Sequence, residues 1–201
     1  MKISTPPKIS RFFFKDVMFE KNTSDKEIFL TFDDCSDIDL TYDVLDILSK
    51  KKLKATFFPI GEYLEYTKIH HSIEKCGHRI GNHSYSHLNG FFSSTQDYYD
   101  DVMKFHRIYE TDIFRPPYGR ITQKQLKLVQ RNYKVVMWSI MTYDFDRTMN
   151  ADDCFNIVKK NVRPGSIIVF HTNSKARKNL IDALQNTINY LNEQGFLFQV
   201  L

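Results

Sequence analysis

Several features are scarce or missing in this 201-residue sequence, and each absence excludes a class of protein. Only three cysteines occur, Cys35, Cys76 and Cys154, and their odd number and spacing fit neither a disulfide framework nor a cysteine metal site. No apolar run is long enough to cross a bilayer. Residues 1–14 lack the long apolar core of a signal peptide. We therefore expect free thiols, no membrane-spanning segment and, by default, a cytoplasmic location.

A strong charge of one sign is also missing. The formal net charge is +4, from 28 Lys and Arg against 24 Asp and Glu. The lysines are scattered, and the densest cluster, residues 50–54, lies where a helix is expected to end and where cations are favourable. No basic run is interleaved with aromatic residues, so we expect no nucleic-acid partner. The oligomeric state is not indicated by the sequence.

The apolar pattern predicts alternating strands and helices after an irregular lead-in at residues 1–26. Strands are predicted over residues 27–32, 55–59, 79–81, 112–115, 134–140, 166–170 and 196–201. Helices are predicted over residues 39–51, 61–76 (mostly), 94–109, 123–132, 152–162 and 179–194. This alternation indicates a parallel sheet. No glycine-rich phosphate loop follows the first strand, so a nucleotide-binding fold has no support.

We therefore predict an α/β fold, a distorted or incomplete (β/α) barrel of about seven parallel strands with outer helices, in one domain over residues 27–201. Six polar residues fall at or just after the carboxyl ends of predicted strands: Asp33, Asp34, His83, Arg115, Asp144 and His171. Barrel enzymes build their active sites on this face. The coincidence predicts a site there.

Two neighbouring carboxylates and a pair of histidines could form a metal centre. A carboxylate and two imidazoles are three good ligands for a divalent ion and leave a position for water. His83 and His87, four residues apart, would share one side of a helical turn. Asp33 and Asp34 would alternate along a strand, so that one binds the metal and the other serves as base. Taken singly, the two histidines could also be a surface pair or buried core residues. The two aspartates could also belong to a turn.

Two further stretches suggest catalytic groups. In residues 115–119 two prolines stiffen the chain, and Tyr118 has an N–H that could be aimed at an oxyanion. Arg115 would lie at the edge of the pocket and hold a carboxylate bidentately. His171, after an apolar strand, could protonate a leaving amine. An ordinary proline-rich loop and a capping histidine remain the alternatives.

These motifs together resemble the polysaccharide deacetylase family, also called the NodB-homology domain or carbohydrate esterase family 4. The matching segments, in family order, are residues 31–34 (TFDD), 83–87 (HSYSH), 115–119 (RPPYG), 138–144 and 169–171 (VFH). The resemblance covers roughly residues 27–201. It implies a distorted (β/α) barrel and metal-dependent hydrolysis of an N-acetyl group on a saccharide.

The resemblance also implies a role for each residue. Asp34, His83 and His87 would bind the divalent metal, with zinc as the expected ion. Asp33 would be the general base, oriented by Arg115. The backbone N–H of Tyr118 would stabilise the oxyanion. His171, supported by Asp144, would be the general acid.

The sequence departs from the family pattern at two motifs. Cys35 and Ser36 replace the usual Gly-Pro after the aspartates, and Met141 and Phe145 replace an aspartate and a tryptophan of the fourth motif. A glycine at position 35 would suit a conformation that cysteine dislikes. Cys35 could present a thiol near the metal or simply fill space. Two alternative functions therefore stay open: hydrolysis of another non-peptide amide, and a degenerate carbohydrate-binding domain.

Overall fold

The computed structural model describes residues 4–6, 14 and 16–201, and within them it forms an α/β fold. The elements follow one another in the order β1 (Glu27–Asp34), α2 (Ile38–Lys50), β2 (Thr56–Pro59), α3 (Gly61–Thr67), α4 (His70–Lys75), β3 (Arg79–Ile80), η1 (Gly90–Phe92), α5 (Thr95–His106), β4 (Ile113–Phe114), η2 (Pro117–Gly119), α6 (Gln123–Val129), β5 (Lys134–Val135), β6 (Ile140–Met141), α7 (Ala151–Asn161), β7 (Ile167–His171), α8 (Leu180–Glu193) and β8 (Leu197–Phe198).

Strand β1 lies at the centre of the main sheet. It pairs in parallel with β2 on one side and β7 on the other, and the strand order is β3-β2-β1-β7-β6, with β8 paired to the start of β1. Seven of the eight residues of β1 are buried, as expected for a parallel strand covered on both faces. The register places Asp33 directly beside His171 of β7. The sheet itself therefore brings two predicted site residues together.

A second, two-stranded parallel sheet of β4 and β5 completes the arrangement. An isolated bridge between Asn82 and Phe114 joins it to the end of β3. In the described part of the chain no strand pairing joins β5 to β6, so the barrel is open there. The predicted α/β architecture with parallel strands and outer helices is confirmed.

Some predicted element boundaries are wrong. The apolar run at residues 134–140 is not one strand, because β5 pairs with β4 in the small sheet and β6 pairs with β7 in the main sheet. The predicted helix over 61–76 is two helices, since Lys68 adopts a left-handed conformation (φ 55°) and ends α3. The final strand is only Leu197–Phe198.

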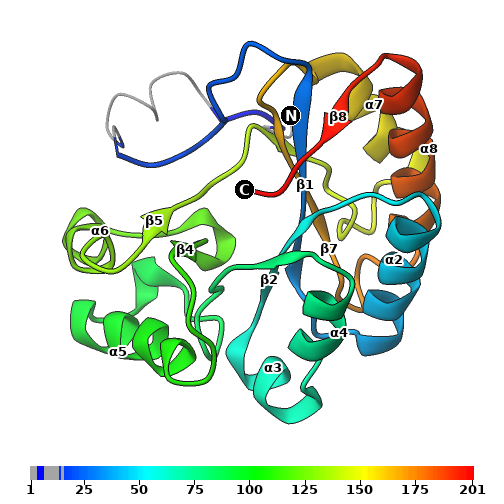
Figure 1. Ribbon diagram of the computed structural model, residues 1–201. Coiled ribbons are helices and arrows are strands. Elements are labelled where there is room, and N and C mark those ends of the chain that lie inside the picture. Colours follow the sequence, from blue (N-terminus) through cyan, green and yellow to red (C-terminus); the bar gives the residue numbers. More distant parts are fainter. Residues whose placement is uncertain (1–3, 7–13, 15) are drawn as a thin grey trace.

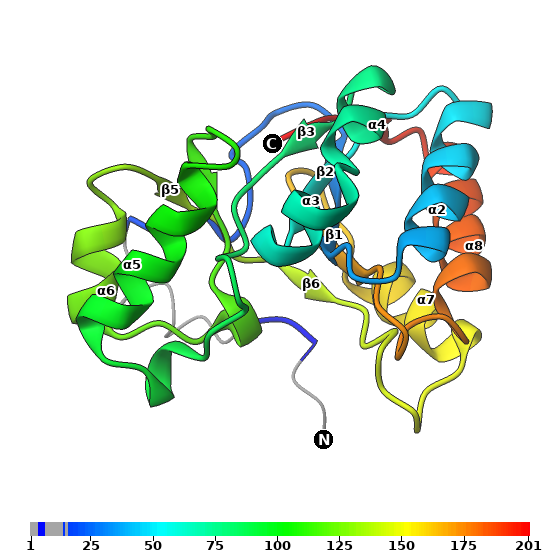
Figure 2. The ribbon, with the colours of Figure 1, turned by 90° about the horizontal axis from the view of Figure 1, so that it is seen from below.

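The helices form two groups around the strands. Figures 1 and 2 show α2, α7 and α8 side by side along the main sheet, and α5 with α6 against β4 and β5 on the opposite side of the molecule. Each group covers its own apolar cluster. Phe32 and Phe170 belong to the larger one, and Tyr98 and Phe114 to the other. Ser94 begins α5 as predicted, since its side chain accepts a hydrogen bond from the N–H of Asp97.

The lead-in segment joins the fold before β1. Met18 makes a parallel bridge to Val136, and Glu20 makes an antiparallel bridge to Ser166. Val17 and Phe19 are buried. Residues 1–3, 7–13 and 15 of the predicted lead-in lie outside the described residues.

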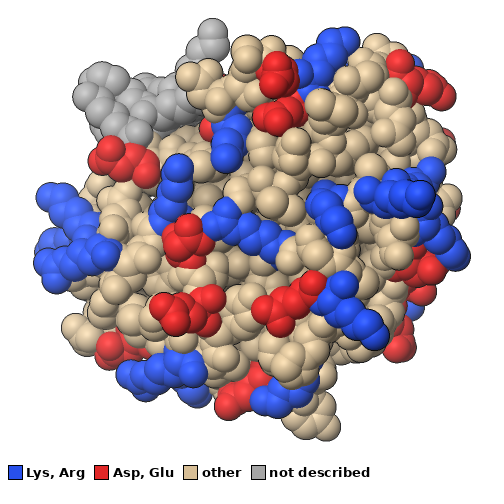
Figure 3. All heavy atoms as spheres, in the orientation of Figure 1, with Lys and Arg blue, Asp and Glu red and all other residues tan. Residues whose placement is uncertain are grey.

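The surface carries charges of both signs. On the face drawn in Figure 3, lysines and arginines alternate with aspartates and glutamates. No helix of the described chain combines the length and the apolar character that a bilayer crossing requires. The absence of a nucleic-acid partner stays a prediction.

Candidate metal and active site

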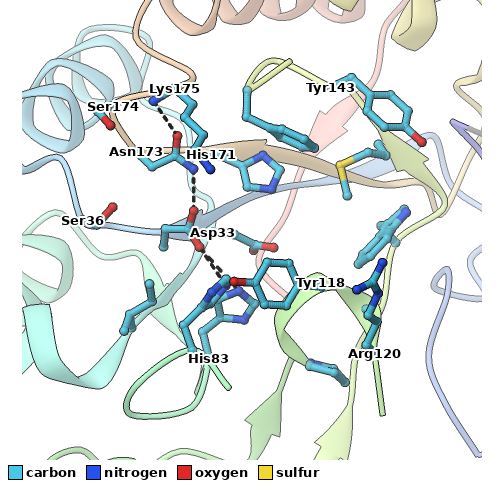
Figure 4. Close-up of a pocket in the computed structure, with 18 residues that line it drawn as sticks. Asp33, Ser36, His83, Tyr118, Arg120, Tyr143, His171, Asn173, Ser174 and Lys175 are labelled. Carbon is cyan, nitrogen blue, oxygen red and sulfur yellow. Dashed lines mark hydrogen bonds and ion pairs between the residues drawn. The ribbon is translucent and has the colours of Figure 1, made fainter. Parts of the chain in front are cut away.

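The predicted site residues converge on one cleft. It has a volume of about 640 Å³ and is lined, among others, by Asp33, Asp34, His83, His87, Tyr118 and His171. Figure 4 shows Asp33, His83, Tyr118 and His171 pointing toward a common centre from different segments of the chain. Arg115 and Asp144 are fully buried and lie behind the cleft wall. All eight residues predicted from the sequence are thus in this one region.

Asp34, His83 and His87 form a group with the composition of a metal site. One ligand atom from each lies within 4.8 Å of the others. The Oδ1 atom of Asp34 is 3.7 Å from Nε2 of His83 and 3.3 Å from Nε2 of His87. One carboxylate oxygen and two imidazole nitrogens suit a divalent transition ion such as zinc.

Both histidines are held in the neutral form that a metal ligand needs. Burial, with a smaller effect from His87, lowers the pKa of His83 to about 3, and burial also lowers the pKa of His87. The Nδ1 atom of His83 is 2.8 Å from the carbonyl oxygen of Arg115, to which its N–H donates. This leaves Nε2 without a proton and directed at Asp34, the arrangement in which an imidazole binds a metal.

The histidines do not lie on a helical turn, and that expectation is wrong. Residues 82–87 form a loop in which Ser84 (φ 62°) and His87 (φ 60°) have left-handed backbone. The loop brings the two rings to a centroid distance of 5.0 Å. Asp101 of α5 stabilises it by accepting hydrogen bonds from the N–H groups of Tyr85 and Ser86. The spacing of four is therefore met by a fixed loop.

Asp33 is paired with a buried arginine. Nη1 of Arg115 donates to Oδ1 of Asp33 at 2.6 Å, and Arg115 has no exposed surface. The same guanidinium donates to Thr31 and to the carbonyl oxygens of Val136 and Met137. The expectation that Arg115 sits at the pocket edge is wrong, because four polar contacts and the ring of Phe58 enclose it beneath Asp33. Because the guanidinium contacts only Oδ1 of Asp33, Oδ2 has no contact with the arginine.

The loop after β4 presents the backbone of Tyr118. Pro117–Gly119 forms a single 3-10 turn in which Tyr118 has a left-handed φ of 58°. Among the described residues, no acceptor is found for the N–H of Tyr118. Tyr118 is 59% exposed, and its ring lies 4.5 Å, between centroids, from the ring of His87. An unpaired N–H beside the metal ligands can serve an oxyanion.

His171 and Asp144 form a buried pair. Nδ1 of His171 is 2.9 Å from Oδ1 of Asp144, and the backbone N–H of His171 donates to Oδ2 at 2.7 Å. Burial alone would lower the pKa of His171, but the carboxylates of Asp144, Asp34 and Asp33 outweigh it and raise the pKa to about 9. Its Nε2 faces the cleft, so His171 can carry a proton there at neutral pH.

Three of the residues that depart from the family pattern, Cys35, Met141 and Phe145, lie in the core or beside the cleft. Cys35 adopts φ 50°, the conformation for which a glycine is favoured, and its side chain is fully buried in the core. Burial raises the pKa of its thiol, so Cys35 fills space as a protonated thiol. Phe145 packs edge-on against His171 at 4.6 Å, and Met141 lines the cleft.

Sequence reasoning missed several supporting residues. Thr31 accepts from Arg115 and donates to the carbonyl of Ile168, Asp101 holds the histidine loop, and Asn173 contacts Asp34. Thr31 belongs to the recognised TFDD segment, which was a usable signal. Asp101 and Asn173 had none, because each acts on residues that are distant in sequence.

The chain has a parallel α/β fold with a carboxylate–histidine–histidine group at the carboxyl ends of its strands. These features define a class of protein, and comparison with known proteins identifies the family within it. The family model described as polysaccharide deacetylase matches residues 20–137. A peptidoglycan-N-acetylglucosamine deacetylase of Bacillus cereus is 37% identical over 184 residues, which cover 87% of this chain and 66% of that relative. The chain thus spans just under two thirds of its length.

Solved structures give the same result. The crystal structure of the Bc1960 peptidoglycan N-acetylglucosamine deacetylase has a TM-score of 0.86 at 33% identity, covering 98% of this chain and 95% of that one. A pseudoenzyme of carbohydrate esterase family 4 from Bacillus anthracis has a TM-score of 0.81 at 26% identity, covering 91% and 66%.

The chain belongs to the polysaccharide deacetylase family, carbohydrate esterase family 4. The predicted family is confirmed, and relatives in it are named as peptidoglycan deacetylases, the class of hydrolase predicted for this chain. The pseudoenzyme among its neighbours makes the individual site residues important, because members of this fold differ in whether they turn over substrate.

The buried ion pair leads to a prediction for stability. Replacing Arg115 by Met leaves the carboxylate of Asp33 buried without its partner, which costs about 3–5 kcal/mol. Arg120→Met, an exposed change in the same loop, should alter the free energy of unfolding by less than about 0.5 kcal/mol. Urea unfolding of both variants at neutral pH measures the difference, and equal effects would contradict the structural role given to Arg115.

The raised pKa of His171 predicts how stability depends on pH in the metal-free chain. The pair with Asp144 stabilises the fold fully below pH 6.5, and this contribution is lost as the pH rises through about 9. The rise corresponds to on the order of 3 kcal/mol. The unfolding free energy of the wild type minus that of His171→Gln should therefore fall between pH 6 and pH 10. A difference that stays flat would show that His171 is not held protonated.

Proposed function

We propose that this chain is a metal-dependent deacetylase that hydrolyses N-acetyl groups on a saccharide, with the N-acetylglucosamine of peptidoglycan as the first substrate to test. The observation that carries the proposal is the convergence of Asp33, Asp34, His83, His87 and His171 on one cleft. The substrate class is taken from the relatives, two of which are named as deacetylases of peptidoglycan N-acetylglucosamine.

The residues present fit a divalent metal, with zinc as the expected ion. We assign Asp34, His83 and His87 as its ligands, because their facing atoms are one carboxylate oxygen and two Nε2 nitrogens, and the hydrogen bond of Nδ1 leaves Nε2 of His83 unprotonated. Such an ion, when bound, lowers the pKa of a coordinated water and polarises a carbonyl oxygen.

Asp33 is proposed as the general base. Arg115 holds Oδ1, so the free Oδ2 can take the proton of the water that attacks the amide carbon. The ion pair with Arg115 fixes the direction of the carboxylate of Asp33.

Two groups complete the proposed mechanism. The N–H of Tyr118 donates a hydrogen bond to the oxyanion that develops when the carbonyl is attacked. His171 carries a proton on Nε2 and gives it to the nitrogen of the leaving amine, which departs as a free amino sugar while acetate remains. Asp144 holds the opposite nitrogen of His171 and keeps the ring oriented.

Two other functions keep the same residues. The same site could act on another non-peptide amide, such as a formyl group. A carbohydrate-binding domain without turnover is the second alternative, and the pseudoenzyme neighbour favours testing it.

The first experiment measures metal content and acetate release on the wild-type chain. We expect about one zinc per chain after incubation with the metal and washing, and acetate release from N-acetylglucosamine oligomers and peptidoglycan that stops on chelation and returns with zinc. Activity on small formamides but not on N-acetylated sugars would favour the alternative in which the site hydrolyses another non-peptide amide. Zinc binding without hydrolysis of any amide would contradict both proposed enzyme functions, the deacetylase and the hydrolase of another amide.

Two variants separate the base from the ligands. Asp33→Asn still offers an oxygen to Arg115, so it should keep zinc but lose at least about 100-fold in kcat. His83→Ala removes a ligand and should lose the zinc itself. Exposed Asp43→Asn and His71→Ala are the matched controls and should change neither quantity. Near-normal turnover by Asp33→Asn would disprove the assignment of the base.

A further inference from the structure

Asn173 lies in the loop after β7 and contacts the carboxylate of Asp34 from the side away from the histidines. Its Nδ2 donates to Oδ2 of Asp34 at 2.6 Å. The other oxygen, Oδ1, faces His83 and His87. The two oxygens of one carboxylate are therefore divided between an amide donor and the imidazoles.

The amide of Asn173 has only one possible orientation. Its Oδ1 accepts hydrogen bonds from the backbone N–H groups of Lys175 at 2.9 Å and Ala176 at 3.1 Å. Figure 4 shows Asn173 with the first of these bonds drawn. Since a carbonyl oxygen accepts these two bonds, the NH₂ group must be the end that points to Asp34.

The loop that carries Asn173 is fastened to the segment that carries Asp34. The N–H of Thr172 donates to the carbonyl of Asp33, and the carbonyl of Thr172 accepts from the N–H groups of Ser36 and Asp37, each at 3.0 Å. Thr172 is fully buried. The donor and the carboxylate are thus positioned by the same set of backbone hydrogen bonds.

From this geometry we propose that Asn173 is a positioning residue of the metal site, which occupies Oδ2 of Asp34 so that Asp34 offers the metal Oδ1 alone. The inference rests on the metal site of the proposed function. A ligand whose second oxygen is held cannot rotate, and residues that orient metal ligands in this way typically contribute 10- to 100-fold to metal affinity.

The test separates this role from that of a loop-forming residue. Asn173→Ser keeps a side-chain oxygen that can accept from the N–H groups of the turn, but it is too short to reach Asp34. Asn173→Ala loses both functions. Exposed Asn156→Ser on α7 is the matched control. Zinc dissociation constants are measured by competition with a chromophoric chelator, urea unfolding is measured on the metal-free chains, and the visible absorption of the Co²⁺-substituted chains reports ligand geometry.

We expect Asn173→Ser to raise the zinc dissociation constant about 10- to 100-fold and to change the Co²⁺ spectrum, with metal-free stability close to wild type. Asn156→Ser should leave the dissociation constant and the spectrum unchanged. Zinc binding within about twofold of wild type in both Asn173 variants would overturn the inference. So would a loss of zinc in Asn173→Ser that is matched by a loss of metal-free stability equal to that of Asn173→Ala.

The outcomes also distinguish this inference from the proposed function. If the wild type binds no zinc, the metal site itself is disproved and the role of Asn173 with it. If the wild type binds zinc, the variants bind it weakly, and no chain releases acetate, the proposed reaction fails while the positioning role stands.

Discussion

The guanidinium of Arg115 has no exposed surface, and a buried charge of this kind persists only when it is paired and hydrogen-bonded. Its partners come from two parts of the chain: Asp33 and Thr31 on β1, and the carbonyls of Val136 and Met137 after β5. The main sheet and the β4–β5 sheet are therefore joined beneath the cleft by one side chain. Its own carbonyl accepts from His83 and so connects the base to the metal ligands.

Backbone strain is concentrated at the same place. Of the eight described non-glycine residues with positive φ, six lie in or beside the cleft: Asp34, Cys35, Ser84, His87, Tyr118 and Tyr143. Such conformations cost on the order of 1 kcal/mol or more each and are kept only where surrounding contacts impose them. Asp101 accepts hydrogen bonds in the loop that contains Ser84 and His87. Thr172 makes backbone hydrogen bonds to Asp33 and Ser36, on either side of Asp34 and Cys35. As a result, the proposed metal ligands, base and oxyanion donor face one centre before substrate binds.

Much of this arrangement could be predicted. The alternation of strands and helices gave the α/β class, and six polar residues at predicted strand ends gave the position of the site, because carboxyl ends of parallel strands meet on one face. Asp33 and His171, at the carboxyl ends of the neighbouring strands β1 and β7, are an example of this rule. The prediction for Arg115 failed in its location, since sequence patterns do not show when an arginine has enough partners to be buried.

The prediction also failed where a local pattern has more than one solution. His83 and His87 are four apart, which fits a helical turn, yet Asp101 from α5 imposes a loop that serves the same purpose. Residues 134–140 look like one strand, but their two ends pair in different sheets. In both cases a contact from a distant element decided between conformations that are close in local energy.

The sequence by itself determined the class of fold, the family, and the identity of the residues that gather in the cleft, because residue types and their order along the chain carry that information. The tertiary structure alone decided how those residues are used. It buried Arg115 under Asp33, and it turned Asp34 so that Oδ1 faces the histidines while Asn173 holds Oδ2. These orientations depend on hydrogen bonds between segments that lie 82 and 139 residues apart, and no pattern of neighbouring residues encodes such a bond.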